Sequence, residues 1–118
     1  MLLVPLPGHS RGHAGVAVHT ADGWLLHAGD AYVHRAQLDP ERAYTPLGLA
    51  AFQRATDFNT RLRRENQERL RVLRAERGTE IQIFCAHDSM EFDICCRTEQ
   101  AVQASQVNVD DEGRGQFT

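Results

Sequence analysis

Three side chains that could bind a metal ion stand directly after predicted strands or in tight loops. His9 lies in the loop PLPGHSRGH, Asp30 follows the segment WLLHAG, and His87 follows EIQIFCA. Imidazole nitrogen and carboxylate oxygen are ligands that zinc accepts near neutral pH. Glycine precedes the first two, which lets the backbone turn sharply and lets a metal or substrate approach closely. The pattern is typical of a metal site assembled from segments that are far apart in sequence.

Short apolar segments predict the strands that position these residues. Small and β-branched residues in GVAVHT, a turn at ADG and the apolar run WLLHA together predict a β-hairpin. The alternating segment EIQIFCA predicts a late strand. We therefore expect strands at Leu2–Leu6, Gly15–Thr20, Trp24–Ala28 and Glu80–Ala86.

The middle of the chain, from Leu47 to Arg77, has a helical composition. Apolar residues recur at helical spacing, and Gly78 stands where a C-terminal cap is expected. Asp57 or Thr60 could start a new helix inside this span. We expect one main helix over one face of the sheet, with a short helix before it as the alternative. Residues 36–46 contain two prolines and are predicted to be an irregular surface connection.

Composition limits the function classes. The chain has 118 residues and a net charge of −3, and it contains no lysine. Its arginines are interleaved with glutamates between residues 54 and 77, which favours a solvated helix face over a nucleic-acid-binding surface. No segment approaches the length of a membrane-spanning helix, and the start does not have the pattern of a secretory signal. With three cysteines, two of them adjacent, we expect reduced thiols and a cytoplasmic location, with no nucleic-acid or membrane partner.

The ordered set of motifs resembles the second half of the metallo-β-lactamase fold hydrolases. In that family a strand enters a PGHTxGH or PGHTxGS loop, a hairpin follows whose second strand ends in a GD pair, and a late strand ends in a histidine. The corresponding stretches here are PGHSRGH at residues 7–13, AGDA at 28–31 and FCAHD at 84–88. The match in order and context extends over residues 2–93.

The resemblance implies a fold and a chemistry. The fold would be α/β (α+β), half of an αββα sandwich, with a mixed sheet of about four strands and one main helix. His9 would complete a first zinc site, Asp30 would bridge two metals, and His87 would belong to the second site. The implied activity is zinc-dependent hydrolysis of a small-molecule lactone, ester or thioester-type substrate. Residues 1–98 would form this half-domain, and residues 99–118 are expected to be a disordered tail.

One family signature is missing. The family's HxHxDH motif, which supplies most of the remaining ligands, does not occur in this sequence. The expectation is therefore a truncated or inactive fragment with little turnover, partnered by a complementary N-terminal half. The alternative is a non-catalytic binding or dimerisation domain, working as a homodimer, that retains a partial metal site.

Other residues near these motifs have competing interpretations. His34 follows Asp30 at a spacing that would suit a catalytic residue facing the site, although a structural role is favoured. His13 is expected to hydrogen-bond its own loop, and Cys85 to be a small apolar core residue. Asp88 could orient a metal ligand from the second shell. His19 and His27 are expected to make cross-strand contacts in the hairpin.

Overall fold

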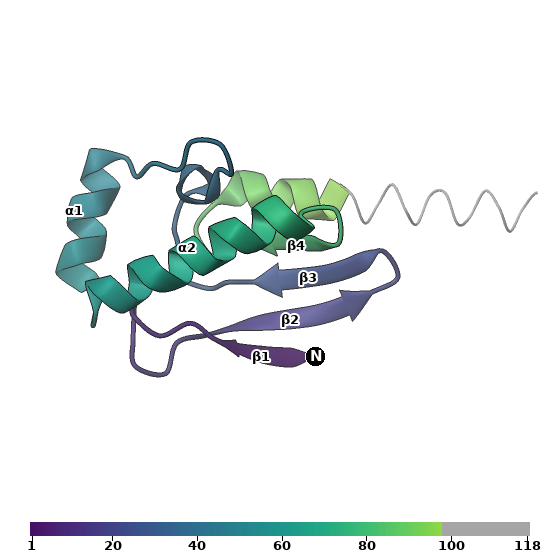
Figure 1. Cartoon of the computed structure of the whole chain (residues 1–118), viewed down its shortest axis with the longest axis horizontal. Helices are drawn as coiled ribbons and strands as arrows, with labels where there is room; N and C mark the ends of the chain where they lie inside the picture. Colours follow the sequence, from purple (N-terminus) through teal and green to yellow (C-terminus); the bar gives the residue numbers. More distant parts are fainter. Residues whose placement is uncertain (98–118) are drawn as a thin grey trace, which may run out of the picture.

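The fold is built on one mixed four-stranded sheet with the strand order β1-β2-β3-β4. The computed structural model describes residues 1–97. Its strands are β1 (Leu2–Pro5), β2 (Ala14–Thr20), β3 (Gly23–His27) and β4 (Ile81–Phe84) (Figure 1). The described chain is therefore α+β, an arrangement compatible with half of a metallo-β-lactamase-like sandwich.

Strand directions bring three separate loops to one edge of the sheet. β1 and β2 are antiparallel, β2 and β3 are antiparallel, and β3 and β4 are parallel. The β1–β2 loop and the segments that follow β3 and β4 therefore all lie at the same edge. The Ala86 amide donates to the Gly29 carbonyl at 3.0 Å, which extends the β3–β4 pairing beyond the strands. This pairing brings the residue after Gly29 beside the residue after Ala86.

The core lies between the sheet and helix α2 (Thr60–Arg77). The α2 residue Leu70, only 3% exposed, packs with inward-facing strand residues such as Leu26 and Ile83. Burial of such apolar side chains provides the main stabilising free energy of a small domain. The Asn59 side chain begins α2 by accepting a hydrogen bond from the Leu62 amide at 3.1 Å.

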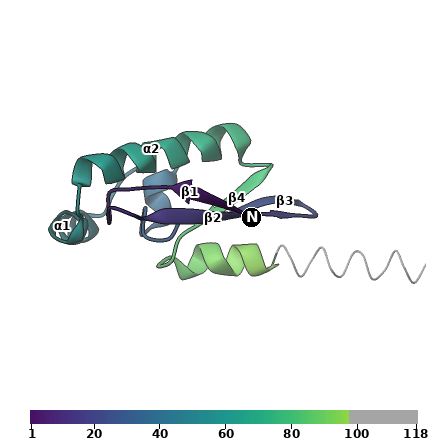
Figure 2. The same cartoon turned by 90° about the horizontal axis from the view of Figure 1, so that it is seen from below.

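Three further helical segments complete the described chain. The 3₁₀ helix η1 (Arg35–Leu38) follows β3, and α1 (Leu47–Thr56) precedes α2. A helix over residues 89–97 follows β4. Figure 2 shows this last helix on the side of the sheet opposite to α2.

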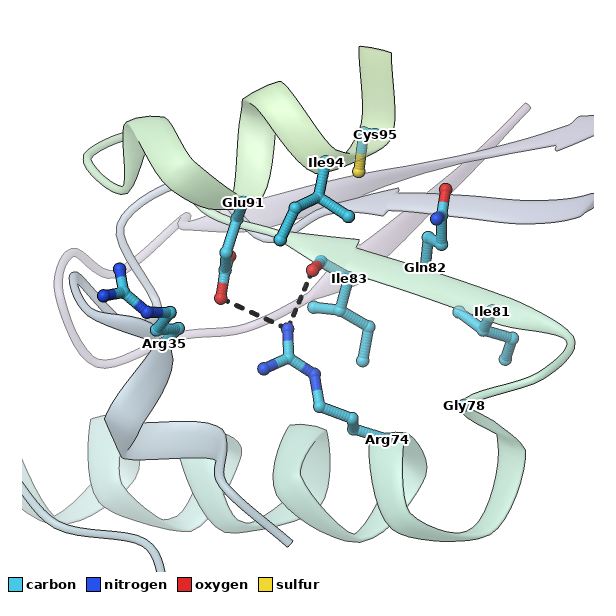
Figure 3. A pocket seen from close by; sticks show the side chains of 9 residues that line it. All are labelled: Arg35, Arg74, Gly78, Ile81, Gln82, Ile83, Glu91, Ile94 and Cys95. Atoms are coloured by element: carbon cyan, nitrogen blue, oxygen red, sulfur yellow. Dashed lines mark hydrogen bonds and ion pairs between the residues drawn. The ribbon is translucent and has the colours of Figure 1, made fainter. Parts of the chain in front are cut away.

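A polar network joins α2, β4 and the helix over residues 89–97. Arg74 donates to the Ile83 carbonyl at 2.8 Å and pairs with Glu91 at 3.3 Å (Figure 3). Glu91 also accepts hydrogen bonds from the buried Tyr32 hydroxyl, at 2.5 Å, and from the Cys85 amide, at 3.2 Å. The charge of Glu91 is thereby satisfied although this residue is only 7% exposed.

Apolar side chains remain accessible on the sheet face opposite to α2. The register places Leu3 beside Val16, and Val18 beside Leu25, on this face. Leu3 is 72% exposed and Val18 is 41% exposed. We call these four residues the open sheet face.

Most of the predicted elements are confirmed. All four strands lie within one or two residues of their predicted bounds, and the short helix before the main one is present as α1. The prediction of an irregular connection over residues 36–46 is partly wrong, because η1 occupies its start. The His34 side chain accepts a hydrogen bond from the Ala36 amide and so begins this helix. The predicted tail at 99–118 lies outside the described residues. Within residues 1–97, no helix has the length and apolarity required to cross a membrane.

Candidate functional site

The structure brings the three predicted metal ligands together around the carboxylate of Asp30. His9 Nε2 lies 3.5 Å from Asp30 Oδ2, and His87 Nε2 lies 2.8 Å from Asp30 Oδ1. The side chains of His9 and Asp30 are about one-third exposed, and that of His87 is 63% exposed. Ligands separated by 21 and 57 positions in sequence thus meet at one edge of the sheet.

The arrangement consists of two pairs that share one carboxylate. Each imidazole approaches a different oxygen of Asp30, and within residues 1–97 no group of three or more His, Cys, Asp or Glu side chains is arranged to hold one metal ion. The contact between His87 and Asp30 is close, yet Asp30 Oδ1 is buried without a hydrogen-bond partner. A carboxylate oxygen and an imidazole nitrogen that converge at 2.8 Å are also donors of the kind that one cation can bind together. The donors fit a metal in type but are too few to complete a tetrahedral site.

His13 positions Asp30 and is not free to bind a metal through either ring nitrogen. Its Nδ1 donates to the Leu6 carbonyl at 2.9 Å, and its Nε2 accepts from the Asp30 amide at 2.9 Å. The expected structural role of His13 is therefore confirmed. Gly29 has φ +58°, and a Cβ atom there would lie 2.8 Å from His13 Nε2. Both the backbone conformation and this close approach require glycine.

Asp57, a residue that the sequence reasoning did not select for the site, lies behind His9. Its side chain is fully buried, and its Oδ1, which has no hydrogen-bond partner, lies 4.0 Å from His9 Nδ1. Its Oδ2 accepts hydrogen bonds from Arg63 at 2.6 Å and from Thr60 at 3.3 Å. Metal-binding imidazoles commonly present their second nitrogen to such a carboxylate. No motif signals Asp57, because it comes from the α1–α2 connection, far from His9 in sequence.

Backbone contacts hold the His9 loop against the start of α2. The Asn59 amide donates to the Gly8 carbonyl at 2.8 Å, and the Phe58 amide donates to the His9 carbonyl at 3.2 Å. Gly8 has φ +141°, and a Cβ atom there would lie 2.3 Å from the Arg63 amide nitrogen. The loop can approach α2 this closely only because residue 8 has no side chain.

A cavity of about 490 Å³ opens beside the Asp30 carboxylate. Its lining includes the polar residues His9, Asp30, His34 and His87 and the apolar residues Val33, Leu49 and Phe52. The sequence-predicted candidate His34 therefore does face the site. Its Nδ1 accepts from the Ala36 amide at 3.1 Å, which leaves the Nε2–H group of a neutral ring as a hydrogen-bond donor.

Asp88 and Cys85 have structural environments. The Asp88 carboxylate binds the Arg35 side chain and accepts hydrogen bonds from the amides of Arg35, Met90 and Glu91. Burial raises the pKa of Asp88, but these amides and the Arg35 charge outweigh burial and hold the pKa below its usual value. Asp88 thus caps the helix over residues 89–97 and binds η1, in place of the expected contact with a ligand. Burial raises the pKa of the Cys85 thiol to about 11, as befits a core residue.

His19 and His27 contact neighbouring aromatic rings in the sheet. The His19 ring lies 4.9 Å from that of its cross-strand partner Trp24, and the His27 ring lies 4.8 Å from that of Phe84. These contacts confirm the expected cross-strand roles.

Comparison with known proteins places this geometry in a family context. No family model matches the sequence. Two curated proteins, both named probable metallo-hydrolase, from Mycobacterium tuberculosis and Mycobacterium bovis, are each 42% identical to this chain over 88 residues. The chain is a homologue of part of these metallo-hydrolases. The match covers 75% of this chain but 28% of each relative, so this chain spans less than a third of their length.

The homology agrees with the metal-ligating chemistry of the site. The name of these relatives implies a metal, although it does not identify the ion. The metallo-hydrolase resemblance derived from the motifs is therefore confirmed. The assignment of His9, Asp30 and His87 as ligands stays a prediction.

Proposed function

We propose that this chain supplies His9, Asp30 and His87 to the metal centre of a metal-dependent hydrolase. The observation that carries the proposal is the shared Asp30 carboxylate, with one imidazole beside each oxygen. A carboxylate suits this position because both of its oxygens are donors that a divalent cation would accept. Zinc fits the mixed imidazole and carboxylate donors, and the substrate class would be a lactone, ester or thioester.

The residues of the chain would have different roles in such a site. A bound zinc would supply an activated water and polarise the scissile carbonyl group. His13 and Gly29 fix the position of Asp30, and Asp57 faces the free nitrogen of His9. The Nε2–H group of His34 can hydrogen-bond an oxygen of a substrate in the cavity. Because the described donors do not complete a site, we propose that the isolated chain turns over slowly or not at all.

Metal titration of the purified 118-residue chain tests the proposal. We expect zinc to bind at fewer than two equivalents per chain, and the variants His9→Ala, Asp30→Ala and His87→Ala each to weaken binding by at least about tenfold. His19→Ala serves as the matched control because it removes an imidazole that contacts Trp24 in the hairpin and is not among the candidate ligands. Competition against a chromophoric chelator measures each affinity.

Two results would contradict the proposal. Zinc affinity that is unchanged in all three variants would show that the metal binds elsewhere. Two tightly bound zinc ions together with rapid hydrolysis of a generic ester or lactone would show that the chain is a complete enzyme, contrary to the expected low turnover.

A second candidate function is a binding or dimerisation domain. The observation that favours it is the open sheet face, where Leu3 and Val18 expose apolar surface on regular strands. Such a surface fits a second copy of this chain. The nucleotides upstream of the Met1 codon discriminate between the candidates, since an HxHxDH sequence there would favour the hydrolase.

A further inference from the structure

The cavity that the candidate metal ligands line also has apolar lining residues, which we call the apolar wall. Val33, Leu49 and Phe52 form this wall, and Leu49 and Phe52 both lie on α1. Among the described residues, the buried core includes no α1 side chain, and Phe52 is 60% exposed. The apolar residues of α1 that line the cavity are therefore not packed in the described core, and a ligand in the cavity can contact them.

Polar contacts hold the wall in place. Gln53 is the one buried residue of α1, and its side-chain oxygen accepts a hydrogen bond from the Gln37 amide group at 2.7 Å. The Gln37 side-chain oxygen in turn accepts from the amides of Val33 and His34. The pair Gln37 and Gln53 thus links α1 to the backbone of Val33 and His34.

We propose that the cavity binds the alkyl chain of an acyl substrate, and that Phe52 and Leu49 set the preference for chain length. This inference rests on the proposed hydrolase function, since it places the scissile group beside His9, Asp30 and His87. The cavity volume of about 490 Å³ lies within the usual range of about 300–1,000 Å³ for small-molecule sites. The negative charge of Asp30 disfavours binding of an anionic ligand in the cavity unless a cation is bound there. A neutral alkyl group can bind through contacts with the apolar wall alone. The substrates are therefore aliphatic esters, thioesters or lactones.

Two ligand series test the wall and the metal separately. Ethanol and 1-hexanol are titrated into the metal-free chain, and butyrate and octanoate into the zinc-loaded chain, with binding followed by amide chemical shifts in NMR spectra. Each fully buried methylene raises affinity about fourfold. Because the wall is partly open to solvent, we expect a total gain of about tenfold from the shorter to the longer ligand in each series.

Phe52→Ala is expected to abolish most of the dependence on chain length. Phe58→Ala is the matched control, because Phe58 is 55% exposed, lies near α1 and does not line the cavity. Circular dichroism checks that both variants stay folded. Leu49→Ala provides a second test should Phe52→Ala fail to fold.

The outcomes separate this inference from the proposed function. Alcohol binding without dependence on chain length, or equal effects of Phe52→Ala and Phe58→Ala, would overturn the alkyl site. So would shifts centred on Phe84 and Phe92, because these two residues line a different pocket after β4. The NMR signals of Phe52 could instead shift with protein concentration in the absence of ligand. That result would show that Phe52 contacts another protein molecule, and it would overturn the alkyl site. If the alcohols behave as expected but octanoate binds equally with and without zinc, the alkyl site stands and the metal proposal fails.

Discussion

At the scale of single residues, the site depends on side chains that hold other side chains. His13 donates from Nδ1 to the Leu6 carbonyl and accepts at Nε2 from the Asp30 amide, and Asp57 lies behind His9. Neither His13 nor Asp57 is a candidate ligand. Each lies against one, His13 against Asp30 and Asp57 against His9, and limits its orientation. Such outer contacts typically change metal affinity by about 10- to 100-fold when removed.

Asp57→Asn is expected to lower zinc affinity by about tenfold or more, because it removes the negative charge that lies 4.0 Å from His9 Nδ1. The change also weakens the buried pair with Arg63, so the free energy of unfolding should fall. Thr60→Val is the control, since it removes a hydrogen bond to Asp57 Oδ2 and leaves the oxygen that faces His9. Chelator competition measures affinity, and urea unfolding confirms that the samples are folded. Equal zinc affinities for Asp57→Asn and the wild type would contradict the positioning role.

At the scale of elements, buried polar networks fix how the helices meet the sheet. Arg74 on α2, Tyr32 after β3 and Glu91 on the helix over residues 89–97 form one such network. Tyr32 is fully buried. Burial raises the pKa of its hydroxyl group well above the usual value, and the Glu91 charge raises it further.

The raised pKa of Tyr32 predicts a loss of stability in alkaline solution. A group whose pKa is higher in the folded state stabilises the fold fully below its unfolded pKa, about 10 for tyrosine, and less as the pH rises above that value. In a Tyr44→Phe chain, where Tyr32 is the remaining tyrosine, phenolate absorbance should rise only when circular dichroism shows unfolding. Formation of the Tyr32 phenolate at about pH 10 in a chain that is still folded would contradict the prediction.

At the scale of the whole molecule, the two faces of the sheet differ. One face packs on α2, while the β1–β2 part of the other face keeps Leu3 and Val18 exposed. Exposed apolar surface on regular strands favours association.

Self-association through the open sheet face is therefore expected at micromolar to millimolar concentrations. The double variant Leu3→Ser, Val18→Thr should weaken it by about tenfold or more, because it removes apolar area from the contact. Leu47→Ser is the matched control: Leu47 is 90% exposed but lies on α1, away from this face. Sedimentation velocity across a concentration series measures the effect. Equal association of the double variant and Leu47→Ser would show that a different surface is used.

The sequence by itself determined the strands, the hairpin, the main helix and the three candidate ligands. Alternation, turn residues and helical spacing are local signals, and each ligand candidate directly follows a predicted strand or lies in a glycine-containing loop. Gly8 and Gly29 correctly indicated the two loops. At both positions φ is positive and another segment lies close to the backbone, and glycine is the residue that tolerates both conditions.

Only the tertiary structure decided which distant groups meet. The parallel pairing of β3 with β4 sets Asp30 beside His87, and the packing of the α1–α2 connection on the first loop places Asp57 behind His9. The tertiary structure also makes Asp88 a helix cap where a contact with a candidate ligand was expected, and it brings apolar residues of α1 into the cavity that the candidate ligands line. These relations depend on contacts across many intervening residues, for which sequence spacing carries no information.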